Sequence, residues 1–112
     1  MTRPETRYRV DFPVFLMWQD RAGTLRRLPG KCLDLSASGA LVEARDAMAP
    51  QSGVVMNSDG FGRIGHASVR YCRRQGLKYR IGLQFTSALV LSDSMRRKFL
   101  ERAIGEQPLK FA

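Results

Sequence analysis

The sequence is poor in the residues from which catalytic and metal sites are usually built. Its 112 residues include one histidine, His66, and two cysteines, Cys32 and Cys72, which do not form a CxxC pair. A single histidine excludes an HExxH helix, and the spacing of the three residues matches no recognised zinc motif. The chain also lacks a GxSxG elbow and a GxxxxGKS/T phosphate loop. We therefore predict that the protein is not an enzyme and has no catalytic residue, metal or cofactor.

Long apolar runs and secretory features are also missing. The longest apolar run covers residues 14–18, whereas a helix that spans a bilayer needs about 20 apolar residues. The N-terminus shows no apolar segment followed by a small-residue cleavage site, and the cysteine spacing indicates free thiols. We expect a reduced, cytoplasmic protein without a membrane segment.

Acidic residues are outnumbered by basic ones. The chain has 10 Asp and Glu against 19 Lys and Arg, a net charge of +9, and most of the cations are arginine. The planar guanidinium group of arginine pairs well with phosphates and with guanine edges, so an anionic partner is indicated, although a basic surface also favours solubility. The length and a hydrophobic content of 44% predict one domain with its own core.

Most of the chain consists of short segments in which apolar and polar residues alternate, as in half-buried strands. Pro13 in the first segment indicates a strand edge or a bulge, and Pro29-Gly30 interrupts the second as a bulge or barrel corner would. The predicted strands cover residues 8–18, 24–35, 40–44, 53–56, 61–74 and 79–85.

The pattern changes once, near the C-terminus. Apolar residues recur there at helical spacing, Ser92 or Asp93 can cap a helix, and Gly105 stands where it would stop. We predict an all-β, or small α+β, fold: an antiparallel barrel or sandwich whose C-terminal helix covers one open end.

Residues 1–7 are polar and contain a proline, which predicts a flexible N-terminal arm before the first strand. In an extended arm Arg3 and Arg7 lie on one side, with Cα atoms ~13 Å apart, a span suited to a mid-sized anionic ligand. A disordered basic tail is the alternative. The predicted divisions are the arm at 1–7, the barrel and helix at 8–105, and a C-terminal tail at 106–112.

Residues 34–39 form a turn between two predicted strands. If the first three are extended, Asp34 and Ser36 share one face, which makes them two exposed polar side chains, while Leu33 and Leu35 share the core face. Gly39 is expected to supply a positive φ, and its missing Cβ would let a ligand approach the backbone.

Three motifs in order carry a resemblance to a known family. Residues 3–7 read RxxxR, residues 34–39 read DxSxxG, and residues 82–85 read Gly-Leu-Gln-Phe. Together they resemble the PilZ domain over residues 3–105. The resemblance implies a six-stranded antiparallel barrel that binds the bacterial second messenger cyclic di-GMP. The ligand-binding residues that it implies are Arg3, Arg7, Asp34, Ser36 and Gly39.

The chemistry of these side chains agrees with that assignment. Arginine can pair with a phosphate or with guanine O6 and N7, and the Asp34 carboxylate can accept the guanine N1 and N2 hydrogens. Arg9 either joins Arg7 or replaces it, and Arg7 is preferred because residue 5, four before Arg9, is glutamate. Thr2 stands where many family members have a further arginine that accompanies binding of two ligand molecules. The resemblance is therefore compatible with either one or two molecules of cyclic di-GMP per chain.

Three functions follow from these features. The leading one is a receptor in which the ligand orders the arm and alters a surface for an unidentified effector protein. The second is binding of single-stranded nucleic acid through residues 70–74 and the aromatic residues Trp18, Phe61 and Tyr71. A solvated strand end explains those charges as well, so nucleic acid is disfavoured. The third, a scaffold that binds only protein, is disfavoured because both ligand motifs are intact.

Overall fold

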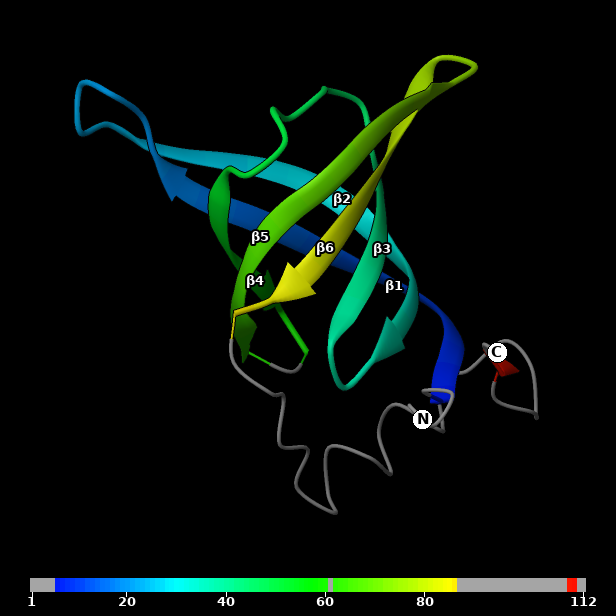
Figure 1. The fold of residues 1–112 in the computed structure, drawn as a ribbon. Helices are drawn as coiled ribbons and strands as arrows, with labels where there is room; N and C mark the ends of the chain where they lie inside the picture. Colours follow the sequence, from blue (N-terminus) through cyan, green and yellow to red (C-terminus); the bar gives the residue numbers. More distant parts are fainter. Residues whose placement is uncertain (1–5, 61, 87–108, 111–112) are drawn as a thin grey trace.

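The computed structural model of the protein describes residues 6–60, 62–86 and 109–110 (Figure 1). The predicted helix at 92–105, Arg3 and almost all of the predicted tail lie outside these residues. The strands are β1 (Thr6–Gln19), β2 (Leu25–Ser36), β3 (Gly39–Ala44), β4 (Gly53–Ser58), β5 (Gly62–Gln75), β6 (Lys78–Phe85) and β7 (Leu109–Lys110). Among the described residues, no helix is long and apolar enough to cross a membrane.

The strands form one antiparallel sheet that closes on itself. Their order is β2-β3-β6-β5-β4-β1-β7, and β2 also pairs with β1, so that β1 to β6 make a closed ring. The short strand β7 pairs with the beginning of β1. The prediction of a six-stranded antiparallel barrel is confirmed.

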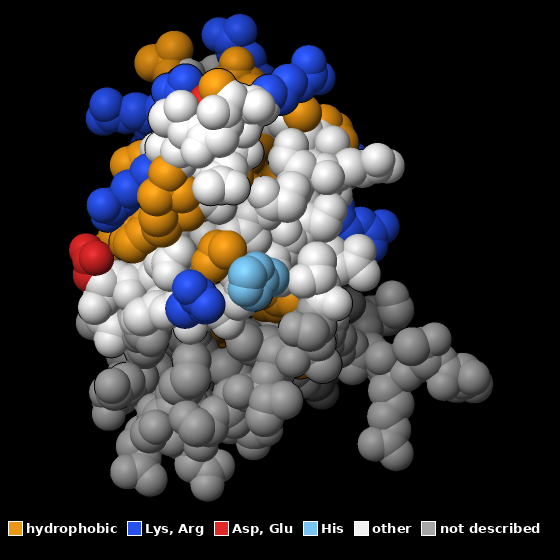
Figure 2. Space-filling model, turned by 90° about the vertical axis from the view of Figure 1, so that its left-hand side faces the viewer, with side chains coloured by type: hydrophobic (Ala, Val, Ile, Leu, Met, Phe, Trp, Pro, Cys, Tyr) orange, Lys and Arg blue, Asp and Glu red, His pale blue; other side chains and the backbone are white. Residues whose placement is uncertain are grey.

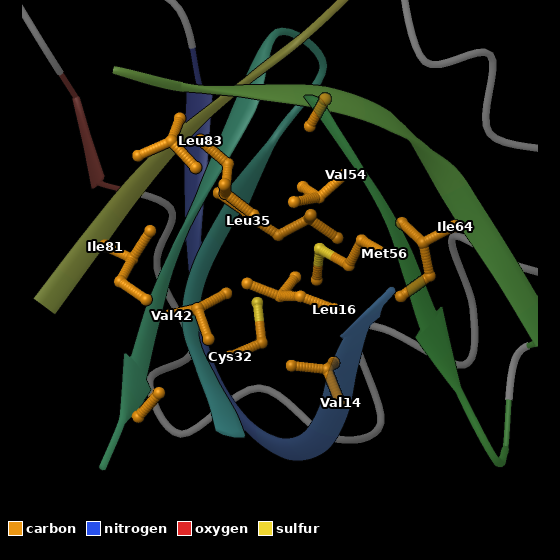
Figure 3. Close-up of a cluster of buried hydrophobic side chains, with 14 of the residues drawn as sticks. Val14, Leu16, Cys32, Leu35, Val42, Val54, Met56, Ile64, Ile81 and Leu83 are labelled. Carbon is orange, nitrogen blue, oxygen red and sulfur yellow. The ribbon is translucent and has the colours of Figure 1, made fainter. Parts of the chain in front are cut away.

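The interior is filled by apolar side chains that alternate along the strands. On β1, every second residue from Val10 to Leu16 is buried. Figure 3 shows side chains from all six barrel strands meeting in this core. Full burial of a large apolar side chain contributes about 1.5–3 kcal/mol. The large side chains that are less than 2% exposed are Phe12, Leu16, Leu35, Met56, Ile81, Val10, Val42, Val69 and Cys32.

Cys32 is a buried thiol within this core. Its Sγ donates a hydrogen bond to the carbonyl oxygen of Asp34 at 3.2 Å, and burial raises the pKa of the thiol far above its ordinary value of 9.0. Cys32 and Cys72 are both free, as the cysteine spacing predicts. The neutral thiol of Cys32 therefore acts as a small apolar side chain.

Two predicted details of the strands were wrong. The first strand begins at Thr6 rather than residue 8. Thr6 pairs with Lys110 of β7, and Arg7 pairs with Leu109 of β7 and with Ser36 of β2, partners that no local pattern shows. Pro29 and Gly30 do not interrupt β2, since both remain paired with β1. A Cβ on Gly30 would lie 2.7 Å from the Glu43 carbonyl oxygen, so the glycine is needed where β3 passes closely.

The turns lie at two opposite ends of the barrel. Because neighbouring strands are antiparallel, the turns at 20–24 and 76–77 and the loop at 45–52 lie at one end, which we call the hairpin end. The turn at 37–38 lies at the opposite end of the barrel, which we call the site end. Figure 1 shows the β1–β2 and β5–β6 hairpins projecting from the hairpin end.

Candidate functional site

The pairing of β1 with β2 gathers four predicted site residues on one face. Arg7 lies opposite Ser36, and Arg9 lies opposite Asp34. Directly paired residues of antiparallel strands point to the same side, so the four share one face of this strand pair. Leu35, on the other face, is buried in the core. The expectation that Asp34 and Ser36 share a face holds.

Arg7 and Asp34 form an ion pair between the two motifs. Arg7 Nη1 lies 3.0 Å from Asp34 Oδ1, and the two side chains are 30% and 14% exposed. Because Arg7 keeps contact with solvent while Asp34 is mostly buried, the pair contributes on the order of 1 kcal/mol to stability. Its main effect is therefore on position, since it holds a guanidinium group and a carboxylate side by side at the site end.

Ser36 is not the exposed polar side chain that was predicted. It is 2% exposed, and its hydroxyl donates to the carbonyl oxygen of Gly39 and accepts from the Gly39 N–H, both at 3.2 Å. These two bonds close the turn between β2 and β3. Ser36 therefore supports the backbone on which Asp34 stands.

Gly39 is required for a reason other than the one expected. The described glycines with positive φ are Gly23, Gly62 and Gly76, and Gly39 is not among them. Instead, a Cβ on Gly39 would clash with the carbonyl oxygen of Leu83 on β6. The space expected to admit a ligand is occupied on that side by the neighbouring strand.

The turn at 37–38 and the third motif at residues 82–85 form one unit. Gly39 pairs with Gln84, and the Phe85 N–H donates to the Ser38 carbonyl oxygen at 2.7 Å. The sequence analysis missed this contact. The sequence did hold a signal for this contact. Residues 82–85 matched the family pattern, but the match was not connected with the turn at 37–38.

Arg3 lies outside the described residues, and Arg9 is exposed beside the ion pair. Arg9 is directly opposite Asp34, whereas Arg7 reaches the same carboxylate diagonally. Both arginines thus lie on the side of β1 that faces outward with Asp34.

The face beyond Asp34 is less polar. Leu41 lies opposite Asp34, Gly82 lies opposite Leu41, and Tyr71 lies opposite Gly82. The Tyr71 ring lies against Gly82, where an added Cβ would be 2.5 Å from its Cζ. Trp18, in turn, packs against the core. Tyr71 is 42% exposed, so of these two rings only Trp18 is packed against the core in the described part of the chain, and a row of stacking rings of the kind that binds single strands is not formed by this pair.

No cluster suited to a metal ion is found in residues 6–60, 62–86 and 109–110: three or more His, Cys, Asp or Glu side chains do not come together there. Arg7, Arg9, Asp34 and Ser36 bring guanidinium, carboxylate and hydroxyl groups to the site end. These groups suit a ligand that has both phosphates and hydrogen-bond donors.

Comparisons with known proteins identify similar chains. A family model described as PilZ domain matches residues 2–102. The PilZ domain of YcgR from Escherichia coli with c-di-GMP has 16% sequence identity and a TM-score of 0.57, covering 88% of this chain and 86% of that one. The crystal structure of YcgR in complex with c-di-GMP, also from Escherichia coli, has 16% identity and a TM-score of 0.55, covering 87% of this chain. The match spans 42% of that longer chain. No curated protein matches the sequence.

Proposed function

The chain belongs to the PilZ domain family, and on this basis we propose that it is a non-enzymatic receptor for cyclic di-GMP. The observation that carries the proposal is the contact between two motifs, in which Arg7 of RxxxR lies 3.0 Å from Asp34 of DxSxxG. The solved PilZ domain of YcgR, with which this chain shares its fold, contains c-di-GMP. The proposed ligand-binding residues are Arg3, Arg7, Asp34, Ser36 and Gly39, together with Arg9.

Cyclic di-GMP suits this arrangement because it contains two phosphates and two guanines. Arg7 or Arg9 can pair with a phosphate or with guanine O6 and N7. Asp34 can accept the N1 and N2 hydrogens of guanine, which adenine does not offer. Because the Arg7–Asp34 pair already holds both side chains in place, ligand binding loses less side-chain entropy. Ser36 and Gly39 contribute by fixing the turn.

We propose further that the ligand orders the N-terminal arm at 1–7 against the barrel at 8–105. Arg3 would then contact the ligand, and fixing each residue of the arm costs about 1–2 kcal/mol. Thr6 and Arg7 already belong to β1, so that cost applies to fewer residues than the sequence indicated. The rearranged surface would engage an effector protein, which makes the protein an adaptor.

Isothermal titration calorimetry with cyclic di-GMP tests the proposal. Wild type should bind with a micromolar or lower dissociation constant. Arg7→Ala and Asp34→Ala should each raise that constant by about tenfold to a hundredfold, as expected for a lost charged hydrogen bond. Arg74→Ala is the matched control. Arg74 is exposed at the hairpin end, and its Nε donates to the Gly76 carbonyl oxygen in its own turn at 3.1 Å.

The outcomes separate the alternatives. Cyclic di-AMP should bind wild type much more weakly than cyclic di-GMP, and Asp34→Ala should reduce that difference. The proposal fails if wild type does not bind, or if Arg7→Ala and Asp34→Ala bind as tightly as Arg74→Ala. The fitted stoichiometry decides between one ligand molecule and two.

A further inference from the structure

The hairpin end of the barrel carries apolar side chains that the core does not use. Leu25, which follows the turn at 20–24, is 60% exposed, and Leu77, in the turn at 76–77, is 90% exposed. Tyr71, the other large exposed apolar side chain among the described residues, lies against Gly82. A single exposed leucine is ordinary, but here one lies at or near the tip of each projecting hairpin.

Basic residues lie close to both leucines in the sequence. Arg21, Arg26 and Arg27 lie near Leu25 in the chain, and Arg73, Arg74 and Lys78 lie near Leu77. Figure 2 shows Lys and Arg side chains around this end, with hydrophobic side chains beside them. The end therefore combines positive charge with aliphatic tips.

The acidic groups near these cations only partly offset them. Asp20 pairs with Arg26 at 2.9 Å and also accepts from the N–H groups of Ala22 and Thr24. Glu43 on β3 lies 3.4 Å from Lys78. Residues 73–80 contain no acidic residue. The β5–β6 hairpin is thus the more strongly basic of the two.

We propose that the hairpin end docks on the surface of an anionic lipid bilayer. Leu25 and Leu77 would enter the boundary between headgroups and acyl chains, and the adjacent arginines would contact lipid phosphates while their stems cover apolar surface. A hollow of about 500 Å³ lies along β2 and β3, and its charged lining is mixed: Lys31, Arg45 and Lys78 together with Glu43 and Asp46. The two leucines lie on separate hairpins and do not form a single pocket. Such an arrangement suits a broad, deformable surface such as a bilayer better than a partner of fixed shape.

The described residues favour a bilayer over nucleic acid. Binding of single strands depends on a row of exposed aromatic faces, whereas the tips carry leucines, Trp18 packs against the core, and Tyr71, which is 42% exposed, has its ring against Gly82. Docking at the hairpin end would also leave Asp34 and Arg7, at the opposite end, facing away from the lipid. The inference therefore does not depend on the proposed ligand.

Vesicle co-sedimentation of the full chain tests the proposal. The probes are vesicles of phosphatidylcholine alone and vesicles of equal parts phosphatidylcholine and phosphatidylglycerol. Wild type should sediment only with the second. Leu25→Ser with Leu77→Ser should weaken partitioning by about tenfold or more, and Arg73→Gln with Arg74→Gln by about thirtyfold. All four side chains are exposed, so thermal melting should confirm that the variants fold.

Arg63→Gln is the control for charge, because Arg63 is exposed near the beginning of β5, at the site end. It should weaken partitioning less than twofold, whereas Arg74→Gln alone should weaken it about fivefold. Equal losses for these two variants would overturn the proposal, since they would show attraction by net charge alone. The proposal would also be overturned if the double leucine variant sedimented with anionic vesicles as strongly as wild type. It would be overturned, too, if wild type stayed in solution with anionic vesicles, whether or not it bound a single-stranded oligonucleotide.

Discussion

Replacing Gly39 with alanine should destabilise the barrel through one backbone contact. The new Cβ would clash with the Leu83 carbonyl oxygen and lie 3.3 Å from the Leu83 carbonyl carbon. Leu83 belongs to β6, which is hydrogen-bonded to β3 on one side and to β5 on the other. The strand cannot move away without disturbing both ladders, so the strain must be distributed over the sheet.

The magnitude follows from two opposing effects. Overpacking that shifts the backbone costs typically 1–3 kcal/mol, and the alanine restricts the unfolded chain, which offsets about 0.4–1 kcal/mol. We take the upper part of the first range because the obstructing atoms are backbone. The net loss is about 2 kcal/mol in the free energy of unfolding. For a chain of this size that corresponds to a fall in Tm of roughly 8 °C.

Two other glycines provide matched controls. Gly53 on β4 has no atom within 4 Å of its added Cβ and does not have a positive φ, so Gly53→Ala should be neutral or stabilising by about 0.5 kcal/mol. Gly82→Ala would meet the Tyr71 ring, a side chain that is 42% exposed and can rotate away. We expect an intermediate loss of about 1 kcal/mol.

Urea unfolding followed by circular dichroism, together with melting curves, measures all three variants. The expected order of stability is Gly53→Ala, then Gly82→Ala, then Gly39→Ala. If Gly39→Ala melts together with Gly53→Ala, the close approach of β6 does not constrain this position, and our account of Gly39 is refuted.

Other substitutions test the turn and the core. Ser36→Ala removes both hydrogen bonds to Gly39 and should cost about 1–2 kcal/mol by urea unfolding, whereas no change would mean that the turn closes without the hydroxyl. Leu16→Ala should cost about 2–5 kcal/mol, because the side chain is fully buried, and a smaller loss would show that the core collapses around the cavity. Native Cys32 should resist alkylation under conditions that modify it in urea, as measured by mass spectrometry. Because burial raises the pKa of Cys32 above 9.0, its contribution to stability is present below pH 9.0 and falls above it, by up to about 1.4 kcal/mol per pH unit. Cys32→Ala should therefore lose stability less steeply than wild type in urea titrations above that pH, and equal slopes would refute the assignment.

The sequence predicted what depends on neighbouring residues and missed what depends on distant ones. Period-two alternation placed the last barrel strand at 79–85, and it runs from Lys78 to Phe85. The burial of Ser36 and the need for Gly39 depend on hydrogen bonds across the turn and on β6. The sequence shows that a serine and a glycine occupy these positions, but it does not show which contacts make them necessary. Likewise, the early start of β1 depends on β7.

The candidate site shows the same division. That Asp34 and Ser36 share a face follows from strand geometry, but the arrival of Arg7 beside Asp34 depends on the register between β1 and β2. Family resemblance implied only that both residues bind the ligand, because no local pattern fixes the alignment of two strands. The irregularity in β2–β3 pairing between Cys32 and Asp34 also went unpredicted, since no proline or glycine marks residues 32–34 as a bulge.

The pairing of β1 with β7 has a consequence for how this barrel can be connected to other chains. Thr6 and Arg7 lie beside Lys110 and Leu109, so the first and last described strands are adjacent. Domains with adjacent ends can be inserted into a loop of a host protein through short linkers, or circularly permuted. The junction here would lie next to Arg7, so tension from a host chain would act directly on the strand that carries this guanidinium group. An engineered insertion of the barrel could therefore couple mechanical strain in the host to occupancy of the site.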